Sequence, residues 1–460
     1  MDREGGSGGA EGDELVEMQA AHTCRHAYGA DQINKFAFFM AVRDGVAMTT
    51  TALSSPAPSS TWLVLLCASR FATSLSFMVY AGALVPAMQA WGMSAGEAGS
   101  IQTAFNIGYA LSLVGSSWFA DSLGAKRVFL WASWATALTG LAFAVFARSA
   151  ESGLLLFALL GLTQGGTYAP SIMLVAQGVP TERRGAAVGW LLGAGSLGYF
   201  ASIALAAGLA ERFGYEAAFI ACGLGPLLAA LLATPGLRGR ANLVASGSAR
   251  RLRGAFRFLA DRRSFLLTAG YTAHCWELLG MWAWLPAFLT ASLAESGGAG
   301  MRGLWIAAAI HLSGFLSSLL MGRASDRLGR RAVLVAMALL GAACSFSIGW
   351  MDGLPLILVL AVAALYGFSA LGDSPVLSTA MTESVEPGSL GAALAVRSIL
   401  GFGAGGAAPL AVGLVLDQAG GMGAQMDGSP WGWGFALLGV GGALATICAL
   451  LLPADRPQRS

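Results

Sequence analysis

From residue 62 onward, the chain alternates between long apolar runs and short polar segments. The runs are about 20 residues long, which is the length that an α-helix rising 1.5 Å per residue needs to cross a bilayer. One longer interruption, residues 235–264, separates the sixth run from the seventh. The pattern predicts an all-α membrane protein with twelve transmembrane helices, at 62–90, 98–118, 128–147, 153–178, 186–209, 216–234, 265–290, 302–322, 332–350, 354–380, 390–416 and 431–452.

These runs define a division into two six-helix bundles, residues 62–234 and 265–453, joined by a basic linker at 235–264 and followed by a short tail at 454–460. Residues 1–61 are mostly polar, and the apolar stretch at 33–42 is too short to span a bilayer. Two interpretations of this segment stay open. It is either a cytoplasmic N-terminal tail or the product of a mis-assigned start, with Met48 as the alternative beginning.

Composition agrees with a chain that lies mostly in lipid. Of its 460 residues, 56% are hydrophobic and 11% are charged, whereas a soluble domain carries about 25% charged residues. The six cysteines show no short paired spacing, which argues against a disulfide framework or a zinc site. The net charge of +2 gives no indication of nucleic-acid binding.

The distribution of basic residues predicts the orientation. If the chain begins inside, the inward loops and the tail hold eighteen Lys and Arg residues, whereas the outward loops hold three, Arg148, Arg212 and Arg302. Basic residues are retained on the cytoplasmic side. We therefore expect both termini in the cytoplasm and a multi-pass protein of the cytoplasmic (inner) membrane. The linker either fixes this topology as a solvated segment or binds anionic lipid.

A short motif occurs twice. "FADSLGAKR" at 119–127 and "MGRASDRLGRR" at 321–331 each follow the second run of a half. Pro86 and Pro286 hold similar positions, as do "GAAV" at 185–188 and "GAAL" at 391–394. The two halves are therefore expected to be structurally related.

Twelve spans, a duplicated half, a basic central loop and this motif together resemble the major facilitator superfamily, over residues 62 to about 453. In that family the motif is a latch that holds the inward side shut and releases as the halves rock. The resemblance assigns a latch role to Asp121, Gly124, Lys126, Arg127, Gly322, Asp326, Arg327, Gly329, Arg330 and Arg331. The first copy departs from the pattern at Ser117, Ser122 and Ala125. The alternative is a basic loop that only fixes topology.

Ionisable residues within the runs are the candidates for a site, because each costs about 2.5–3.5 kcal/mol to insert. Arg70 shares a helical side with Thr73 and Tyr80, so it either lines a cavity or extends to the lipid headgroups. Gln164 and Tyr168 form a second polar stripe, which either binds substrate or joins helices. The resemblance places the first, fourth, seventh and tenth spans around a central cavity, so these stripes are candidate substrate contacts.

Proton coupling has its own candidates. His274 and Glu277 are three residues apart on the seventh span, so they are expected on one face, where they either share a proton or form a static hydrogen bond. Asp373 and Arg397 either pair with each other or stay separate. If they are separate, Asp373 can take part in proton transfer, and Arg397 and Arg70 can clamp an anion. His311 receives no assigned role.

Enzyme classes find little support, because the sequence has no P-loop, no usable Ser-containing triad and no metal cluster. We expect a secondary transporter, without a cofactor, that moves a small organic anion such as a carboxylate by alternating access, coupled to protons and acting as a monomer. One alternative is a drug or metabolite exporter of the same fold, although Gly161 stands where drug–proton antiporters of the family carry an arginine. The other is a membrane receptor or assembly protein that does not transport.

Overall fold

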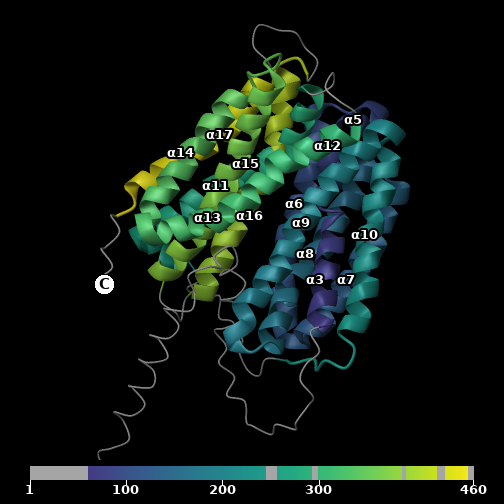
Figure 1. Ribbon diagram of the computed structural model, residues 1–460, viewed down its shortest axis with the longest axis vertical. Coiled ribbons are helices and arrows are strands. Elements are labelled where there is room, and N and C mark those ends of the chain that lie inside the picture. The colour runs from purple at the N-terminus through teal and green to yellow at the C-terminus, as the bar shows by residue number, and fades with distance from the viewer. Residues whose placement is uncertain (1–60, 245–255, 293–298, 386–389, 422–429, 454–460) are drawn as a thin grey trace, which may run out of the picture.

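A computed structural model describes residues 61–244, 256–292, 299–385, 390–421 and 430–453. The expected N-terminal tail up to residue 60, the Met48 alternative and three of the eight linker arginines (Arg250, Arg251 and Arg253) lie outside these residues. Within them the regular secondary structure is helical, with no strand. Figure 1 shows the helices as two groups side by side, the first half purple to teal and the second half green to yellow.

The first half contains six spans. The first is built from three short helices, α3 (Thr61–Ser74), α4 (Val79–Gly82) and α5 (Leu84–Trp91). The next five are single helices: α6 (Ala95–Leu123), α7 (Ala125–Phe146), α8 (Ala150–Gly178), α9 (Thr181–Phe213) and α10 (Tyr215–Gly236).

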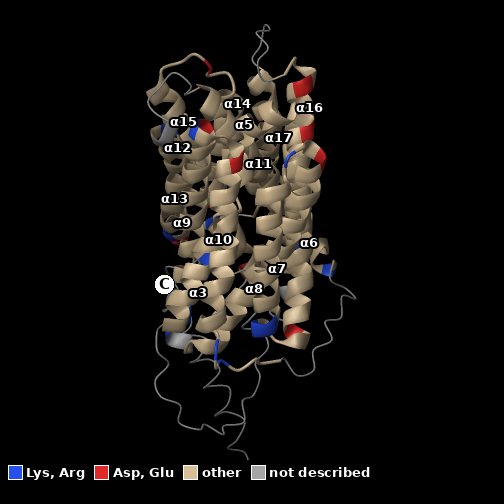
Figure 2. Cartoon of the chain, turned by 90° about the vertical axis from the view of Figure 1, so that its right-hand side faces the viewer, with Lys and Arg blue, Asp and Glu red and all other residues tan. Residues whose placement is uncertain are grey.

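The second half also contains six spans, and here the second of them is interrupted. After the short helix η1 (Arg257–Ala260) come α11 (Arg262–Ser292), then α12 (Ala299–Ala307), η2 (Ala308–Leu312) and α13 (Ser313–Leu328), which together make the eighth span. The last four spans are α14 (Arg330–Ile348), α15 (Leu356–Ser384), α16 (Leu390–Gln418) and α17 (Pro430–Leu451). The twelve helical segments follow the twelve predicted runs, and most of their length carries no charge (Figure 2).

Eight helical segments of the described chain are long and apolar enough to cross a membrane by length and composition alone. The other four are the broken first span and α6, α8 and α11, which carry many of the polar side chains described below. The arrangement is therefore that of a helical membrane protein with a 6+6 repeat.

The break in the first span is held by a side chain from the fourth. Between α3 and α4 the backbone makes tight turns, with Phe77 N donating to Ser74 O at 3.1 Å. Gln164 of α8 donates its amide to Thr73 O at 2.9 Å, and Ser76 Oγ donates to Gln164 Oε1 at 3.4 Å. The amide thus satisfies a buried carbonyl at the point where the helix ends.

Two glycines confirm that the halves are related in structure as well as in sequence. Gly124 and Gly329 occupy the same place in the two motif copies, and each has a φ of +89°. Residues with a side chain rarely adopt this backbone conformation. Each glycine therefore allows the sharp turn between the second and third spans of its half.

We call the end of the bundle where α10 ends and α11 begins the linker end, and the opposite one the far end. Buried apolar side chains form one large cluster with members from both halves, among them Phe77, Phe105, Trp284 and Phe435. Two smaller clusters each belong to one half, one around Leu66 and Phe129, the other around Leu267, Val333 and Met381. The smaller clusters lie toward the linker end.

Contacts between the halves at the far end include close backbone approaches and charge. Asp417, at the end of α16, accepts hydrogen bonds from Ala95 N and Gly96 N in the first turn of α6, each at 2.8 Å. Arg302 of α12 pairs with Glu211 of α9. A Cβ on Gly99 would lie 2.2 Å from Pro409 O. The two halves are therefore firmly joined at this end.

Candidate functional site

Arg70 lies inside the first half, surrounded by tyrosines. It is 6% exposed, donates from Nη2 to the Tyr199 hydroxyl of α9 at 3.3 Å, and has its guanidinium carbon 4.9 Å from the centre of the Tyr168 ring of α8. Tyr109 of α6 is a further neighbour of the same group. The side chain therefore points into the protein and does not extend to the lipid headgroups.

Space for this arginine comes from a glycine on α9. A Cβ at Gly195 would lie 3.0 Å from Arg70 Nε, so any larger residue would press on the guanidinium. Nε has no hydrogen-bond partner among the described residues. A buried guanidinium with a free donor is suited to a carboxylate, which can accept two parallel hydrogen bonds.

Three of the predicted substrate contacts have other partners. Gln164 and Thr73 are joined to each other at the break of the first span. The Tyr80 hydroxyl donates to Ala98 O of α6 at 3.2 Å, and its ring packs on Phe157 with centroids 5.3 Å apart. Thr73 and Tyr80 were expected beside Arg70 because they share its helical side, and Gln164 was expected from a separate polar stripe on the fourth span. The break in the first span turns Tyr80 toward α6 and α8.

The carboxylate that faces His274 is Asp373 of α15, rather than Glu277. Nδ1 of the imidazole lies 3.0 Å from Asp373 Oδ2, and Nε2 lies 3.0 Å from Ser374 Oγ. His274 and Asp373 are both nearly fully buried. Asp373 Oδ1 has no partner within the described segments, and Asp373 lines a small cavity with Gly270 and Cys448.

Glu277 points to a different side of α11. Its Oε1 accepts a hydrogen bond from Ser345 Oγ of α14 at 2.5 Å, and Ser345 is also joined to the Tyr366 hydroxyl of α15. A Cβ on Gly442 of α17 would lie 2.8 Å from Glu277 Oε2. The carboxyl group therefore occupies a polar niche inside the second half that a glycine keeps open.

Arg397 of α16 also packs against a tyrosine. Its guanidinium carbon lies 3.8 Å from the centre of the Tyr271 ring, and Nη2 donates to Ser378 Oγ at 3.2 Å. The close partner of the Asp373 carboxylate is thus His274 and not Arg397. Nη1 of Arg397 finds no partner in the described part of the chain. Each half therefore contributes one buried arginine with an unused donor.

Four aromatic side chains meet between the two halves, and we call them the ring cluster: Phe77 and Tyr199 from the first half, Trp282 and His311 from the second. Ring centroids are 4.7 Å apart for Phe77 and Tyr199, 6.1 Å for Tyr199 and Trp282, 6.1 Å for Tyr199 and His311, and 5.8 Å for Trp282 and His311. Because Tyr199 also bonds Arg70, the cluster adjoins the buried guanidinium.

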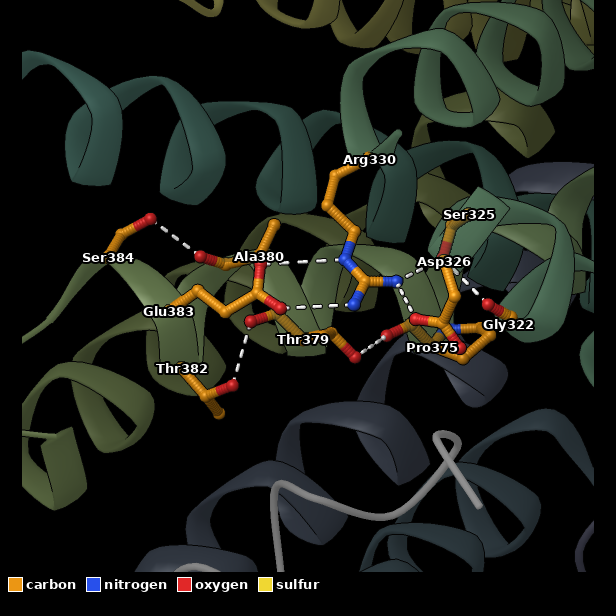
Figure 3. A network of polar contacts seen from close by, with 10 residues as sticks. All are labelled: Gly322, Ser325, Asp326, Arg330, Pro375, Thr379, Ala380, Thr382, Glu383 and Ser384. Carbon is orange, nitrogen blue, oxygen red and sulfur yellow. Dashed lines mark hydrogen bonds and ion pairs between the residues drawn. The ribbon is translucent and has the colours of Figure 1, made fainter. Parts of the chain in front are cut away.

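The second motif copy forms a network within its own half (Figure 3). Arg330 Nη1 lies 2.5 Å from Asp326 Oδ1 and 2.6 Å from Ser325 Oγ. Its Nη2 lies 3.0 Å from Glu383 Oε1 near the end of α15. Arg331 donates to Leu450 O of α17 at 2.7 Å. These bonds tie the loop to α15 and α17.

The first motif copy is bound by the beginning of the linker. Lys126 Nζ donates to Arg240 O at 2.7 Å. Asn242 donates to Leu123 O at 2.8 Å and accepts from Arg127 N at 3.1 Å, beside the turn at Gly124. In this structure both motif copies thus make their reported contacts within one half and its adjoining linker.

A family model described as Major Facilitator Superfamily matches residues 66–310 and 278–460. The chain belongs to the major facilitator superfamily. The resemblance seen in the motif is confirmed, and the protein is a multi-pass membrane transporter and not an enzyme.

Curated relatives of this superfamily member are named as transporters with different cargoes. A "Probable anion transporter 6, chloroplastic" of Arabidopsis thaliana is 32% identical over 33% of this chain and 31% of its own, so the match spans about a third of that relative. A "Quinolone resistance transporter" of Acinetobacter baumannii is 25% identical over 70% of this chain and 79% of its own. A "Probable 4-methylmuconolactone transporter" of Cupriavidus pinatubonensis is 27% identical over 70% and 76%.

Among solved structures, a variant of the nucleoside transporter NupG superposes with a TM-score of 0.69, covering 85% of this chain and 99% of its own at 16% identity. At that identity the likeness shows the fold alone. The superfamily fold therefore stands on both the sequence model and the superposition.

Several residues around the buried charges of this transporter escape a reading of the sequence. Tyr199, Tyr271 and Ser345 come from helices distant in sequence from the charges they touch, and no local motif marks them. His311 and Trp282 offered a weak signal, since each is a polar ring within a long apolar run.

Proposed function

We propose that this superfamily transporter is a secondary active carrier that moves a small organic anion, with carboxylate as the recognised group. The observation that carries the proposal is Arg70, buried among tyrosines from three other helices with Nε unpartnered. A buried cation without a counter-charge is costly. An anionic ligand would supply the missing charge, which is why a transporter tolerates such a residue at this depth.

Arg397 is proposed as the second cation of the site. It lies in the opposite half and keeps Nη1 unpartnered among described residues. An anion held by Arg70 in one half and approached by Arg397 in the other would favour movement of the halves around it. We propose alternating access by such rocking, with the linker end on the cytoplasmic side of the inner membrane and a monomer as the working unit.

Proton coupling is assigned to the His274–Asp373 pair, with Glu277 as a further buried carboxyl group in the same half. The imidazole and the carboxylate are 3.0 Å apart and share no third charged neighbour at hydrogen-bonding distance in the described structure. Protonation of such a pair changes its charge without moving its atoms far. We propose symport, in which anion and proton move together.

An exporter of drugs is the second candidate, supported by the quinolone-resistance relative. Against it stands Gly161 of α8, whose Cβ would lie 2.2 Å from Phe105 O. The arginine that drug–proton antiporters of the family carry at this place has no room here. The relatives named for an anion and for 4-methylmuconolactone support the anion proposal.

Uptake by purified protein in liposomes tests the anion proposal. A panel of labelled carboxylates, neutral nucleosides and cationic drugs would be compared at equal concentration. Arg70→Lys is expected to reduce carboxylate uptake at least about tenfold, because lysine cannot form the bidentate bond. Arg148→Lys, at an exposed ion pair of the far end, is the matched control. Selective uptake of cations, or full carboxylate uptake by Arg70→Lys, would contradict the proposal.

Exchange and net transport separate the proton role from the anion role. Asp373→Asn is expected to abolish accumulation driven by an imposed proton gradient while leaving exchange of internal for external anion intact, because exchange returns the carrier loaded and needs no proton release. Asp352→Asn, at an exposed site of the far end, is the control. Gradient-driven accumulation at the native rate in Asp373→Asn would remove this residue from coupling.

A further inference from the structure

We infer that the transported anion is planar, with an aromatic or conjugated ring that carries its carboxylate at one edge and a second hydrogen-bonding oxygen at the opposite edge. The ring cluster would hold the ring, and the two nitrogens of Trp282 and His311 would face the second oxygen. This inference rests on the proposed anion transport and narrows it to one shape of anion.

The ring cluster lies directly beside Arg70. Tyr199 joins the two, because its hydroxyl accepts a hydrogen bond from Arg70 and its ring faces Phe77, Trp282 and His311. The guanidinium and the cluster therefore lie at the two ends of one tyrosine side chain. A ligand whose carboxylate meets Arg70 would place the next atoms of its skeleton among these rings.

The rings of the cluster meet at different angles. Phe77 and Tyr199 are tilted by 40° at 4.7 Å, and Trp282 meets the Phe77 ring edge-on, at 88° and 6.4 Å. The cluster therefore presents both ring faces and ring edges to a ligand. Aromatic groups favour offset and edge-to-face contacts of this kind, whereas a flexible aliphatic chain would make no use of the ring orientations.

Two buried nitrogen atoms of the ring cluster lack a hydrogen-bond partner in the described structure. Trp282 Nε1 and His311 Nε2 have no hydrogen-bond partner among the described residues, and His311 is 5% exposed. The indole nitrogen is a donor only. Buried polar groups are normally paired. Two unpaired nitrogens on rings whose centroids lie 5.8 Å apart therefore point to a ligand oxygen that both can reach.

An irregular stretch of backbone presents His311. Residues Ala308–Leu312 form a single π-helical stretch within the eighth span. Such turns interrupt the regular helix and are frequent at functional sites. Here the turn presents the imidazole to Tyr199 across the boundary between the halves, so a ligand in the cluster would contact both halves at once.

The experiment compares five probes in liposomes that contain the full chain: 4-hydroxybenzoate, benzoate, cyclohexanecarboxylate, hexanoate and phenol. Inhibition of labelled 4-hydroxybenzoate uptake gives the relative affinities. The expected order is 4-hydroxybenzoate first, benzoate about tenfold weaker through loss of one buried hydrogen bond, the two non-planar acids weaker again, and phenol without effect.

Two variants assign the preference to the cluster. Trp282→Phe keeps a ring but removes the nitrogen, so it is expected to bring 4-hydroxybenzoate and benzoate to within about threefold of each other. Tyr199→Phe removes the hydroxyl at Arg70 and is expected to weaken all acids alike, with their order kept. Trp134→Phe, whose indole bonds Thr234 at the periphery, is the matched control.

The outcomes separate the two levels of proposal. Equal inhibition by planar and aliphatic acids would overturn this inference and leave anion transport standing. Uptake of neither labelled 4-hydroxybenzoate nor any other labelled carboxylate would overturn both. An unchanged preference in Trp282→Phe would overturn the assignment of the second oxygen to the indole.

Discussion

Several buried charged side chains in this transporter depend on neighbouring glycines, which have no side chain. Glu277 lies against Gly442 and Gly341, and Arg70 lies against Gly195, so the space for each charged group is made by the absence of a Cβ on an adjacent helix. The many glycines of the chain are therefore partly a device for admitting polar groups between closely packed helices.

Gly442→Ala tests this dependence. The added Cβ would stand 2.8 Å from Glu277 Oε2 and 2.9 Å from Ala342 Cα, so overpacking is expected to cost about 1–3 kcal/mol and to lower the thermal unfolding midpoint in detergent. Gly193→Ala, where a Cβ meets nothing within 4 Å, should leave the midpoint unchanged or raise it. Equal midpoints for the two variants would contradict the overpacking argument.

Sequence reasoning located the buried charges but paired some of them wrongly. The spacing of His274 and Glu277 places them on neighbouring positions of one helix, and that much follows from helical geometry. Which partner each meets is decided by α14 and α15, which approach α11 from different sides. A pattern along one helix carries no information on that choice.

The break in the first span depends on a residue that is distant in the sequence. "SLSF" at 74–77 contains neither proline nor glycine, so the sequence alone gives no reason for a helix to end there. The amide of Gln164 supplies one, because it donates to the Thr73 carbonyl, which the turn at Ser76 also contacts, and accepts from the Ser76 hydroxyl. Hydropathy therefore predicted the length of this span well and its interruption not at all.

Gln164→Leu is expected to remove this support. A similar volume is kept, but the Thr73 carbonyl loses one of its donors and Ser76 Oγ loses an acceptor, at a cost of about 1 kcal/mol for a buried hydrogen bond. Unfolding in detergent should occur at lower temperature, and amide hydrogen exchange of residues near the break should become faster. Thr163→Val, at a hydroxyl whose bonds lie away from the break, provides the comparison. Unchanged exchange in Gln164→Leu would exclude a holding role.

The two halves taken together show what determines the observed conformation. One shared apolar cluster and the Asp417 bonds join the halves, while each half has its own cluster toward the linker end. A carboxylate at the first turn of a helix interacts favourably with the partial positive charge there. The charge of Asp417 thus helps to hold the two halves together at the far end.

Asp417→Asn should weaken that closure. Asparagine can accept only one of the two bonds through its carbonyl oxygen and carries no charge, so the conformational equilibrium is expected to shift by about tenfold toward opening of the far end. Spin labels at Glu151 and Leu354, exposed on opposite halves, would report a new longer distance. Asp352→Asn should give the native distribution, and the same distribution in Asp417→Asn would exclude the role.

The repeat, the superfamily and the approximate positions of the twelve spans were readable from hydropathy and two motif copies, because lipid imposes a similar length and one backbone structure on the spans. The proposed substrate contacts were readable only in part. Arg70, Tyr168 and Arg397 stand out as polar side chains within apolar runs, whereas Tyr199, Trp282 and His311 come near them only when α9, α11 and η2 pack together. Which side chains from different helices come together depends on how the helices pack, and the hydropathy of a single run does not determine that packing.

The division of the buried apolar side chains has a consequence for how the protein could be built. Since the shared cluster and the Asp417 bonds all lie outside residues 245–255, a gene cut within that segment would encode two polypeptides that retain these contacts between the described parts of the two halves. Co-produced in one cell, such fragments should associate without a covalent connection.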